Sequence, residues 1–330
     1  MSASHESWLP GLQSLLKGPV LITQPTPEEG VDDEVIDDVI DVSIDTIDTV
    51  DTDYETDLDM DYEEWIAEDM IGDEARQQQT YVNQCNETGV IPVSYFLRHI
   101  TNTTFRMRHH GLGPLGAKAI TISLKVSTWL EIICRSERNN LLDSGASSIC
   151  EMLQKNTFLK HLYLANNKFE EQAAHNFREA LSHNETLETL DLGWNHFRTN
   201  GAVSIAEGLQ ENYGLRSLLL TMNGFSEPGA EALGRALKHN RTLTELDVSQ
   251  NRIKEIGAGH IALGLQTNDV LKKLKLGYNP ISEDGALALL TAISKNDQSC
   301  VKHIDLSVST STTPHMCRGN ALLETWTRPT

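Results

Sequence analysis

Hydrophobic and polar positions recur with a fixed period of 28 residues through the C-terminal half of the chain. Each copy follows the frame L-x-x-L-x-L-x-x-N, and a pair of small residues, usually Gly-Ala, comes shortly afterwards. The alternating leucines predict a short strand whose alternate side chains enter a core. Alanines and leucines at helical spacing after the small pair predict a return helix. The clearest copies start at Leu159, Leu187, Leu215, Leu243 and Leu271.

Weaker copies extend the array in both directions. The copy before the first clear one is irregular, because Cys134 and Ser136 stand where leucines are expected, and we interpret it as degenerate or out of register. A still earlier copy includes Met107, and residues 301–306 begin an eighth strand without a helix to close it. Residues 99–308 are therefore expected to hold seven helices and eight strands.

A period of this length, with one strand and one helix per copy, is the signature of a leucine-rich-repeat solenoid. The predicted fold is an α/β horseshoe with parallel strands on the concave face and helices on the convex face. The asparagine after each strand can satisfy backbone groups left open where the chain turns. Because repeat proteins mostly act by presenting an extended surface, the pattern favours binding over catalysis.

A second asparagine recurs at the end of each predicted helix. The repeat length, the full helix and this asparagine resemble the ribonuclease-inhibitor subfamily of leucine-rich repeats. Within it, the segments HHGLGPLGAKAI and NPISEDGALALLTAI resemble the leucine-rich-repeat-containing 74 proteins. This resemblance implies the fold and an intracellular interaction role, and it brings no activity with it. The recurring helix-end residues are Asn184, Asn212, Asn240, Asn268 and Asn296.

Charge is distributed very unevenly along the chain. Residues 28–74 hold 22 Asp and Glu and no Lys or Arg, whereas the whole chain has a net charge of −20, so the repeats are close to neutral. Repulsion among so many carboxylates opposes a compact structure, and we expect an acidic disordered segment there. We also expect a disordered lead over 1–27, a helical or irregular lead-in over 75–98 and a disordered tail over 309–330. Nucleic acid is not an expected partner, since phosphate binding needs a clustered basic surface.

The remaining composition indicates an intracellular protein without a catalytic or metal-binding site. The five cysteines are scattered and include no C-x-x-C, which suits reduced thiols rather than disulfides or zinc. The sequence shows no secretory leader and no apolar run of about 18 residues, so we expect a cytoplasmic or nuclear protein that does not enter a membrane. The sequence also lacks a recognisable catalytic set. We therefore expect no enzyme activity, no cofactor, no metal and no small-molecule substrate.

Side chains that point outward from the strands form the candidate binding surface. Trp194, Met222 and Tyr278 occupy the same slot, just before the repeated asparagine, and predict a stripe along the array. Large side chains on a rigid surface are typical binding anchors, although an aromatic residue at a strand-to-loop turn can instead cover the core. The predicted partner-binding residues are Tyr163, Asp191, Trp194, Leu219, Met222, Asp247, Lys272, Lys273, Lys275 and Tyr278.

Lys272, Lys273 and Lys275 make a local basic patch in this neutral array. It could attract an acidic partner or the chain's own acidic segment, or be an ordinary solvated edge. The leading hypothesis for function is a non-enzymatic scaffold that binds an unidentified protein on the concave face.

Two alternatives remain open for the function. The first is a regulator of an enzyme, of the inhibitor or GTPase-activating type; the latter needs a positioned arginine, for which Arg198, Arg216 and Arg252 are candidates. The second is an acceptor of basic proteins through the acidic segment, with binding that weakens at high salt.

Overall fold

The chain divides into two units, Met1–Glu55 and Thr56–Thr330. All of the residues described by the computed structural model belong to the second unit. The predicted lead 1–27 lies outside the described residues, and so does the predicted acidic segment 28–74 except for residues 73 and 74, which begin a helix. The structure describes residues 73–107, 110–125, 127, 132–134, 139–307 and 325–327.

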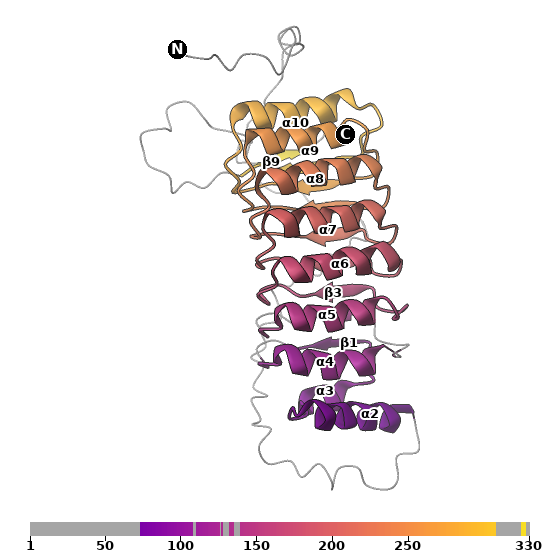
Figure 1. Ribbon diagram of the computed structural model, residues 1–330. Helices are drawn as coiled ribbons and strands as arrows, with labels where there is room; N and C mark the ends of the chain where they lie inside the picture. Colours follow the sequence, from indigo (N-terminus) through magenta and orange to yellow (C-terminus); the bar gives the residue numbers. More distant parts are fainter. Residues whose placement is uncertain are drawn as a thin grey trace, which may run out of the picture. The chain divides into compact units, whose positions relative to one another are not determined.

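Strands and helices alternate through the second unit, and the strands lie in one sheet in sequence order (Figure 1). Among the described residues, eight parallel strands and the seven helices α4 to α10 form the repeats, as the sequence predicted. The strands are β1 (Thr104–Arg106), β2 (Ile132–Cys134), β3 (His161–Tyr163), β4 (Thr189–Asp191), β5 (Ser217–Leu219), β6 (Glu245–Asp247), β7 (Lys273–Lys275), β8 (His303–Asp305) and the antiparallel β9 (Thr325–Thr327). The helices are α2 (Asp73–Thr88), α3 (Ser94–His99), α4 (Gly113–Leu124), α5 (Leu142–Leu153), α6 (Glu171–His183), α7 (Thr199–Glu211), α8 (Ser226–His239), α9 (Glu255–Leu265) and α10 (Glu283–Lys295).

The core lies between the sheet and the layer of helices. In β4 the middle residue, Leu190, is fully buried, and so are the flanking Leu187 and Leu192 of the same repeat. Ala202 and Leu209 meet them from the inner face of α7 and are also fully buried. Each fully buried leucine contributes about 1.5–3 kcal/mol of transfer free energy, so the regular leucine frame accounts for the packing of each repeat.

The asparagine that follows each strand links two repeats. Asn195 is 2% exposed, and its Nδ2 donates to the carbonyl oxygens of Leu192 (2.9 Å) and, in the preceding repeat, Leu164 (3.2 Å). Its Oδ1 accepts from the backbone N–H groups of Asn167 (2.9 Å) and Phe169 (3.1 Å). These bonds confirm the prediction that this side chain satisfies the backbone at the turn.

The helix-end asparagine forms a second ladder at the opposite ends of the strands. Asn212 donates from Nδ2 to the carbonyl oxygens of Leu181 (2.7 Å) and Asn184 (2.9 Å) in the preceding repeat. Its Oδ1 accepts from the N–H groups of Gly214 (3.0 Å) and Leu215 (2.6 Å) in its own loop. Both ends of each strand are therefore tied to the neighbouring repeat, and the sheet face between them is held rigidly.

Glycines set the close approach of α8 and α9. A Cβ atom at Gly234 would overlap the backbone carbonyl of His260, and one at Gly264 would overlap the carbonyl of Gly234. By contrast, a Cβ atom at Gly259, on the same helix α9, would meet no atom within 4 Å. Packing therefore requires glycine at positions 234 and 264, but not at position 259.

The lead-in forms the helices α2 and α3, and α2 packs against α4 at the N-terminal end of the repeats. Tyr81 and Phe96 are each 1% exposed, and their rings meet edge to face with centroids 4.5 Å apart. The Tyr81 hydroxyl oxygen also accepts a hydrogen bond from the Val93 N–H (3.0 Å). The lead-in thus continues the core past the first repeat, which a solenoid end requires.

The irregular repeat results from one inserted residue. Ile132 pairs with His161, 29 positions later, whereas the N–H of Asn139 bonds the side chain of Asn167, 28 positions later. Ile133 is therefore six positions before Asn139, whereas its partner Leu162 is five positions before Asn167. The register places Ile133, and not Cys134, opposite Leu162, so this copy is out of register, which was one of the two interpretations of its sequence.

The C-terminal end also differs from the expectation. Thr325–Thr327 form β9, which pairs antiparallel with β8 and places Trp326 opposite Ile304. The sequence predicted a disordered tail over 309–330, and for these three residues the structure shows a strand instead. The edge of β8 offers unpaired N–H and C=O groups that a further strand can satisfy. Threonine and tryptophan favour strands, so the sequence did carry a signal.

Candidate protein-binding surface

Strand pairing aligns the side chains of the sheet face in columns. In β3, β4 and β5 the first and third residues are partly exposed, while the middle residue is buried. The pairing register places five of the predicted site residues in one column of third positions. Asp305 extends this column and was missed, because the candidate surface did not include the outward side chains of the predicted eighth strand. The column consists of Tyr163, Asp191, Leu219, Asp247, Lys275 and Asp305.

Carboxylates from the two neighbouring strands, β6 and β8, surround Lys275. Its Nζ lies 3.1 Å from Glu245 Oε1 and 3.8 Å from Asp247 Oδ2. Burial by itself lowers the pKa of Lys275, but the hydrogen bond to Glu245 and the charges of Glu245, Asp247 and Asp305 outweigh it, so the pKa is raised. The predicted basic patch is therefore not uniform. The charge of Lys275 is balanced by its neighbours, which separates this residue from Lys272 and Lys273.

Asp247 also differs from its predicted role. It is only 8% exposed, and its Oδ1 accepts a hydrogen bond from the Ser249 N–H (3.0 Å). Asp191 makes the same bond to the Gly193 N–H (2.8 Å) but remains partly exposed. The Asp247 carboxylate therefore closes the turn after its own strand, and little of it is exposed to a partner.

The predicted stripe lies along the turns that follow the strands. Trp194, Met222 and Tyr278 are 53%, 43% and 54% exposed. Each has a positive φ, of 54°, 59° and 56° respectively. Gln250 takes the same slot with φ 57° and separates Met222 from Tyr278. These side chains therefore project from the surface, and none of the three is enclosed in the core.

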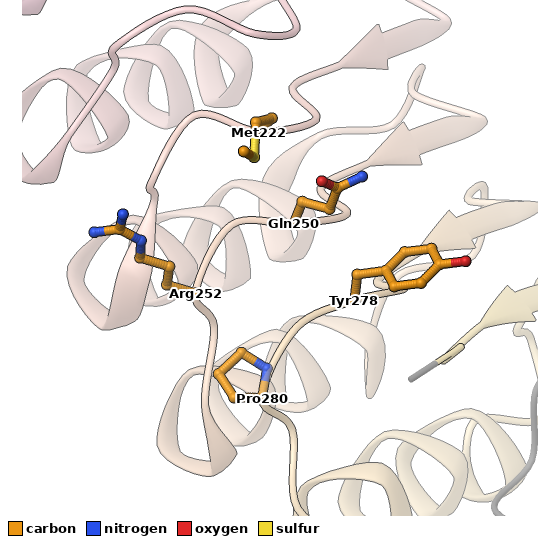
Figure 2. Close-up of a pocket in the computed structure, with 5 residues that line it drawn as sticks. All are labelled: Met222, Gln250, Arg252, Tyr278 and Pro280. Atoms are coloured by element: carbon orange, nitrogen blue, oxygen red, sulfur yellow. The ribbon is translucent and has the colours of Figure 1, made fainter. Parts of the chain in front are cut away.

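A shallow groove of about 430 Å³ lies at the C-terminal part of this stripe (Figure 2). Met222, Gln250 and Tyr278 line it from the turns after three successive strands, and Arg252 and Pro280 line it from the segments that follow two of these turns. Sequence reasoning placed Met222 and Tyr278 on this surface. It missed Gln250 and Pro280 as neighbours, because neither residue type stands out by itself.

The arginines considered for GTPase activation lie in different parts of their repeats. Arg198 is the N-cap residue of α7. Arg216 precedes β5, and its Nε lies 3.8 Å from Glu188 Oε2. Arg252 lines the groove with φ 61°. They share no common structural slot.

Two general properties concern the part of the chain that the structure describes. Within it, no three or more His, Cys, Asp or Glu side chains are grouped so that they could hold a metal ion. None of its helices combines the length and the apolar character needed to cross a membrane.

Comparisons with known proteins identify the repeats. The family model "Leucine Rich repeat" matches residues 183–206, 239–262 and 267–290, and each match spans a strand together with part of the next helix. Human leucine-rich repeat-containing protein 74B is 37% identical over 51 residues, which are 16% of this chain and 13% of that relative. The match thus spans a small part of the length of that relative.

Two solved structures are similar at low sequence identity. The tropomodulin C-terminal domain of Caenorhabditis elegans is 10% identical, with 66% of this chain and 92% of that chain covered and a TM-score of 0.34. Leiomodin-1 Actin-Binding Site 2 is 20% identical, with 68% and 90% covered and a TM-score of 0.32. The repeating frame, the alternating strands and helices and the matching family model agree. The chain is a leucine-rich-repeat protein.

Proposed function

We propose that this chain is a non-enzymatic scaffold that binds a protein partner on the strand face of its repeats. Leucine-rich-repeat domains generally bind proteins, and their fold is typically non-catalytic. In this proposal Trp194, Met222 and Tyr278 are the anchors, and the adjoining sheet face supplies polar contacts.

The observation that carries the proposal is the conformation of the three anchors. A non-glycine residue in the left-handed region costs roughly 1–2 kcal/mol, and asparagine and glycine tolerate that region best. Asn166 occupies the equivalent slot of an earlier repeat with φ 56°. Backbone preference therefore favours asparagine, yet Trp194, Met222 and Tyr278 stand in this slot. Because about half of each remains exposed, core packing does not explain them either, and a partner's surface does.

Rigidity of the surrounding backbone supports the same function. The N–H of Trp194 donates to the carbonyl of Thr221 (2.7 Å), and the N–H of Met222 donates to that of Ser249 (3.0 Å). The slot therefore continues the ladder of hydrogen bonds from repeat to repeat. A surface held in place before binding loses little conformational entropy when a partner docks.

Affinity capture with the full chain tests the proposal. The test variant carries Trp194→Ala and Tyr278→Ala. The matched control carries Tyr213→Ala and Ile256→Ala, because these residues are 73% and 68% exposed and lie outside the strand face. Truncating anchor residues costs about 2 kcal/mol or more, which corresponds to roughly a 30-fold weaker complex. We expect the test variant to lose a partner that the wild type and the control both retain.

Two results would contradict the proposal. Equal recovery of all partners by the three proteins would show that the anchors do not bind. A partner that is lost only when residues 28–72 are deleted would assign binding to the acidic segment. Circular dichroism of each variant checks that the repeats remain folded.

A further inference from the structure

Exposed lysines gather where β7 and β8 begin. Lys272 and Lys273 lie at the start of β7, and Lys302 lies at the start of β8. The N–H groups of Lys302 and His303 both donate to the carbonyl of Lys272 (2.8 and 3.1 Å), so the two strand starts are adjacent. His303 pairs with Lys273 in the sheet register. We call Lys272, Lys273 and Lys302 the cationic cluster.

The charges of the cationic cluster are not balanced within the described ranges. None of its three lysines forms an ion pair there, and all three are exposed. Glu245 pairs with Lys273 in the sheet register, but its carboxylate is bonded to Lys275 at 3.1 Å. Asp305 accepts hydrogen bonds from Ser307 at the far end of β8. The carboxylates on the neighbouring strands are thus engaged elsewhere, which leaves the cluster available to an anion.

The cluster and the groove lie on the same segment of chain. Lys273 begins β7, and Tyr278 follows five positions later at the turn after that strand. An extended chain rises about 3.3 Å per residue, so these two positions are at most about 17 Å apart, because the chain turns at Tyr278. A partner segment that runs along β7 in an extended conformation therefore needs no more than about five residues to reach from the cluster to the groove.

We propose that the cationic cluster binds an acidic segment of the partner protein, located about five residues from a large apolar residue that enters the groove. This inference rests on the proposed function and adds the charge pattern and spacing of the partner. Charge complementarity favours one partner over others and raises the association rate. Because the lysines are exposed, salt weakens the interaction. Because the cluster and the groove lie along the same strand, β7, we expect a single partner to contact both.

Fluorescence anisotropy with the full chain and synthetic peptides tests the inference. The probe peptide has four glutamates, a four-residue Gly-Ser spacer and a tryptophan. Comparison peptides have lysines in place of the glutamates, or no spacer. We expect the probe to bind in low salt, and both comparison peptides to bind at least several-fold more weakly. Failure of the wild type to prefer the probe peptide overturns the inference.

Charge reversal locates the site. The variant Lys272→Glu, Lys273→Glu and Lys302→Glu removes three exposed charge pairs, so we expect the probe to bind about tenfold more weakly. The matched control makes the same change of net charge elsewhere on exposed lysines, and we expect less than about a threefold effect from it. Equal weakening by both variants overturns the inference. The control substitutions are Lys118→Glu, Lys168→Glu and Lys254→Glu.

Carbodiimide coupling of carboxylates to lysines identifies the occupant. Probe glutamates joined to Lys272, Lys273 or Lys302, as read by mass spectrometry, support the inference. Coupling of these lysines to the chain's own carboxylates, with the probe left free, overturns the assignment to a partner. The variant Trp194→Ala with Tyr278→Ala separates the two proposals. If only this variant stops binding the probe, the result supports the anchors and contradicts the role of the cationic cluster. If only the charge-reversal variant stops binding it, the result contradicts the proposed anchors.

Discussion

Replacing Asn195 by alanine should destabilise the repeats far more than the loss of one side chain suggests. The amide oxygen of Asn195 accepts from the buried N–H groups of Asn167 and Phe169, and both would lose their acceptor. An orphaned buried donor costs about 1–3 kcal/mol, so the two together cost roughly 2–6 kcal/mol of unfolding free energy. The lost bonds to the carbonyls of Leu192 and Leu164 act in the same direction.

Asn139, in the first position of the same ladder, provides the control. Its Nδ2 donates to the carbonyl of Met107 (2.6 Å), while among the described residues no donor reaches its Oδ1. Asn139→Ala therefore orphans no N–H group and should cost only about 1 kcal/mol. Denaturant unfolding of both variants measures the difference, and hydrogen exchange at Asn167 and Phe169 reads the two amides directly. If Asn195→Ala cost no more than Asn139→Ala, the ladder would not have the role assigned to it.

Three further predictions follow from local contacts. Gly234→Ala should lower the unfolding free energy by about 1–3 kcal/mol, because its methyl group overlaps a carbonyl of α9, whereas Gly259→Ala should raise it by about 0.5–1 kcal/mol; denaturant titration checks both signs. The pKa of Lys275 is raised in the folded state, so the stability that its charge contributes is complete below the ordinary pKa of 10.5 and is lost as pH rises through the folded value. The unfolding free energy of Lys275→Gln should therefore lack this dependence on pH. Native thiol labelling mapped by mass spectrometry should modify Cys300 and spare Cys150, whose pKa is raised first by burial and then by nearby glutamates; equal labelling would contradict the burial.

Most of the repeat architecture was predictable, because it depends on local periodicity. The frame from Leu159 to Leu276 keeps a constant period, so the strands, helices and ladder asparagines could be placed from spacing alone. Prediction failed where the period changes. One inserted residue before Asn139 shifted β2. The eighth strand was placed despite its two additional residues, but its outward side chains, such as that of Lys302, were not considered.

The candidate surface was predictable in outline and less so in detail. Position in the frame placed Trp194 and Tyr278 on the outward side, but it could not show that both are about half exposed. It also could not show that Asp247 is buried in its own turn or that Lys275 is paired with Glu245. These properties depend on side chains from adjacent strands, and spacing within one repeat carries no information about them.

The sequence alone determined the type of repeat, because a leucine frame of fixed period can bury its apolar face only by stacking one strand and one helix on the next. The tertiary structure alone decided which outward-facing side chains remain available to a partner. The strand register brings Lys272 beside Lys302 and places Lys275 next to the carboxylate of Glu245. It also pairs β8 with β9 at the C-terminal end of the sheet. The physical reason is that exposure and charge balance arise between strands, from residues about 28 to 30 positions apart in the chain.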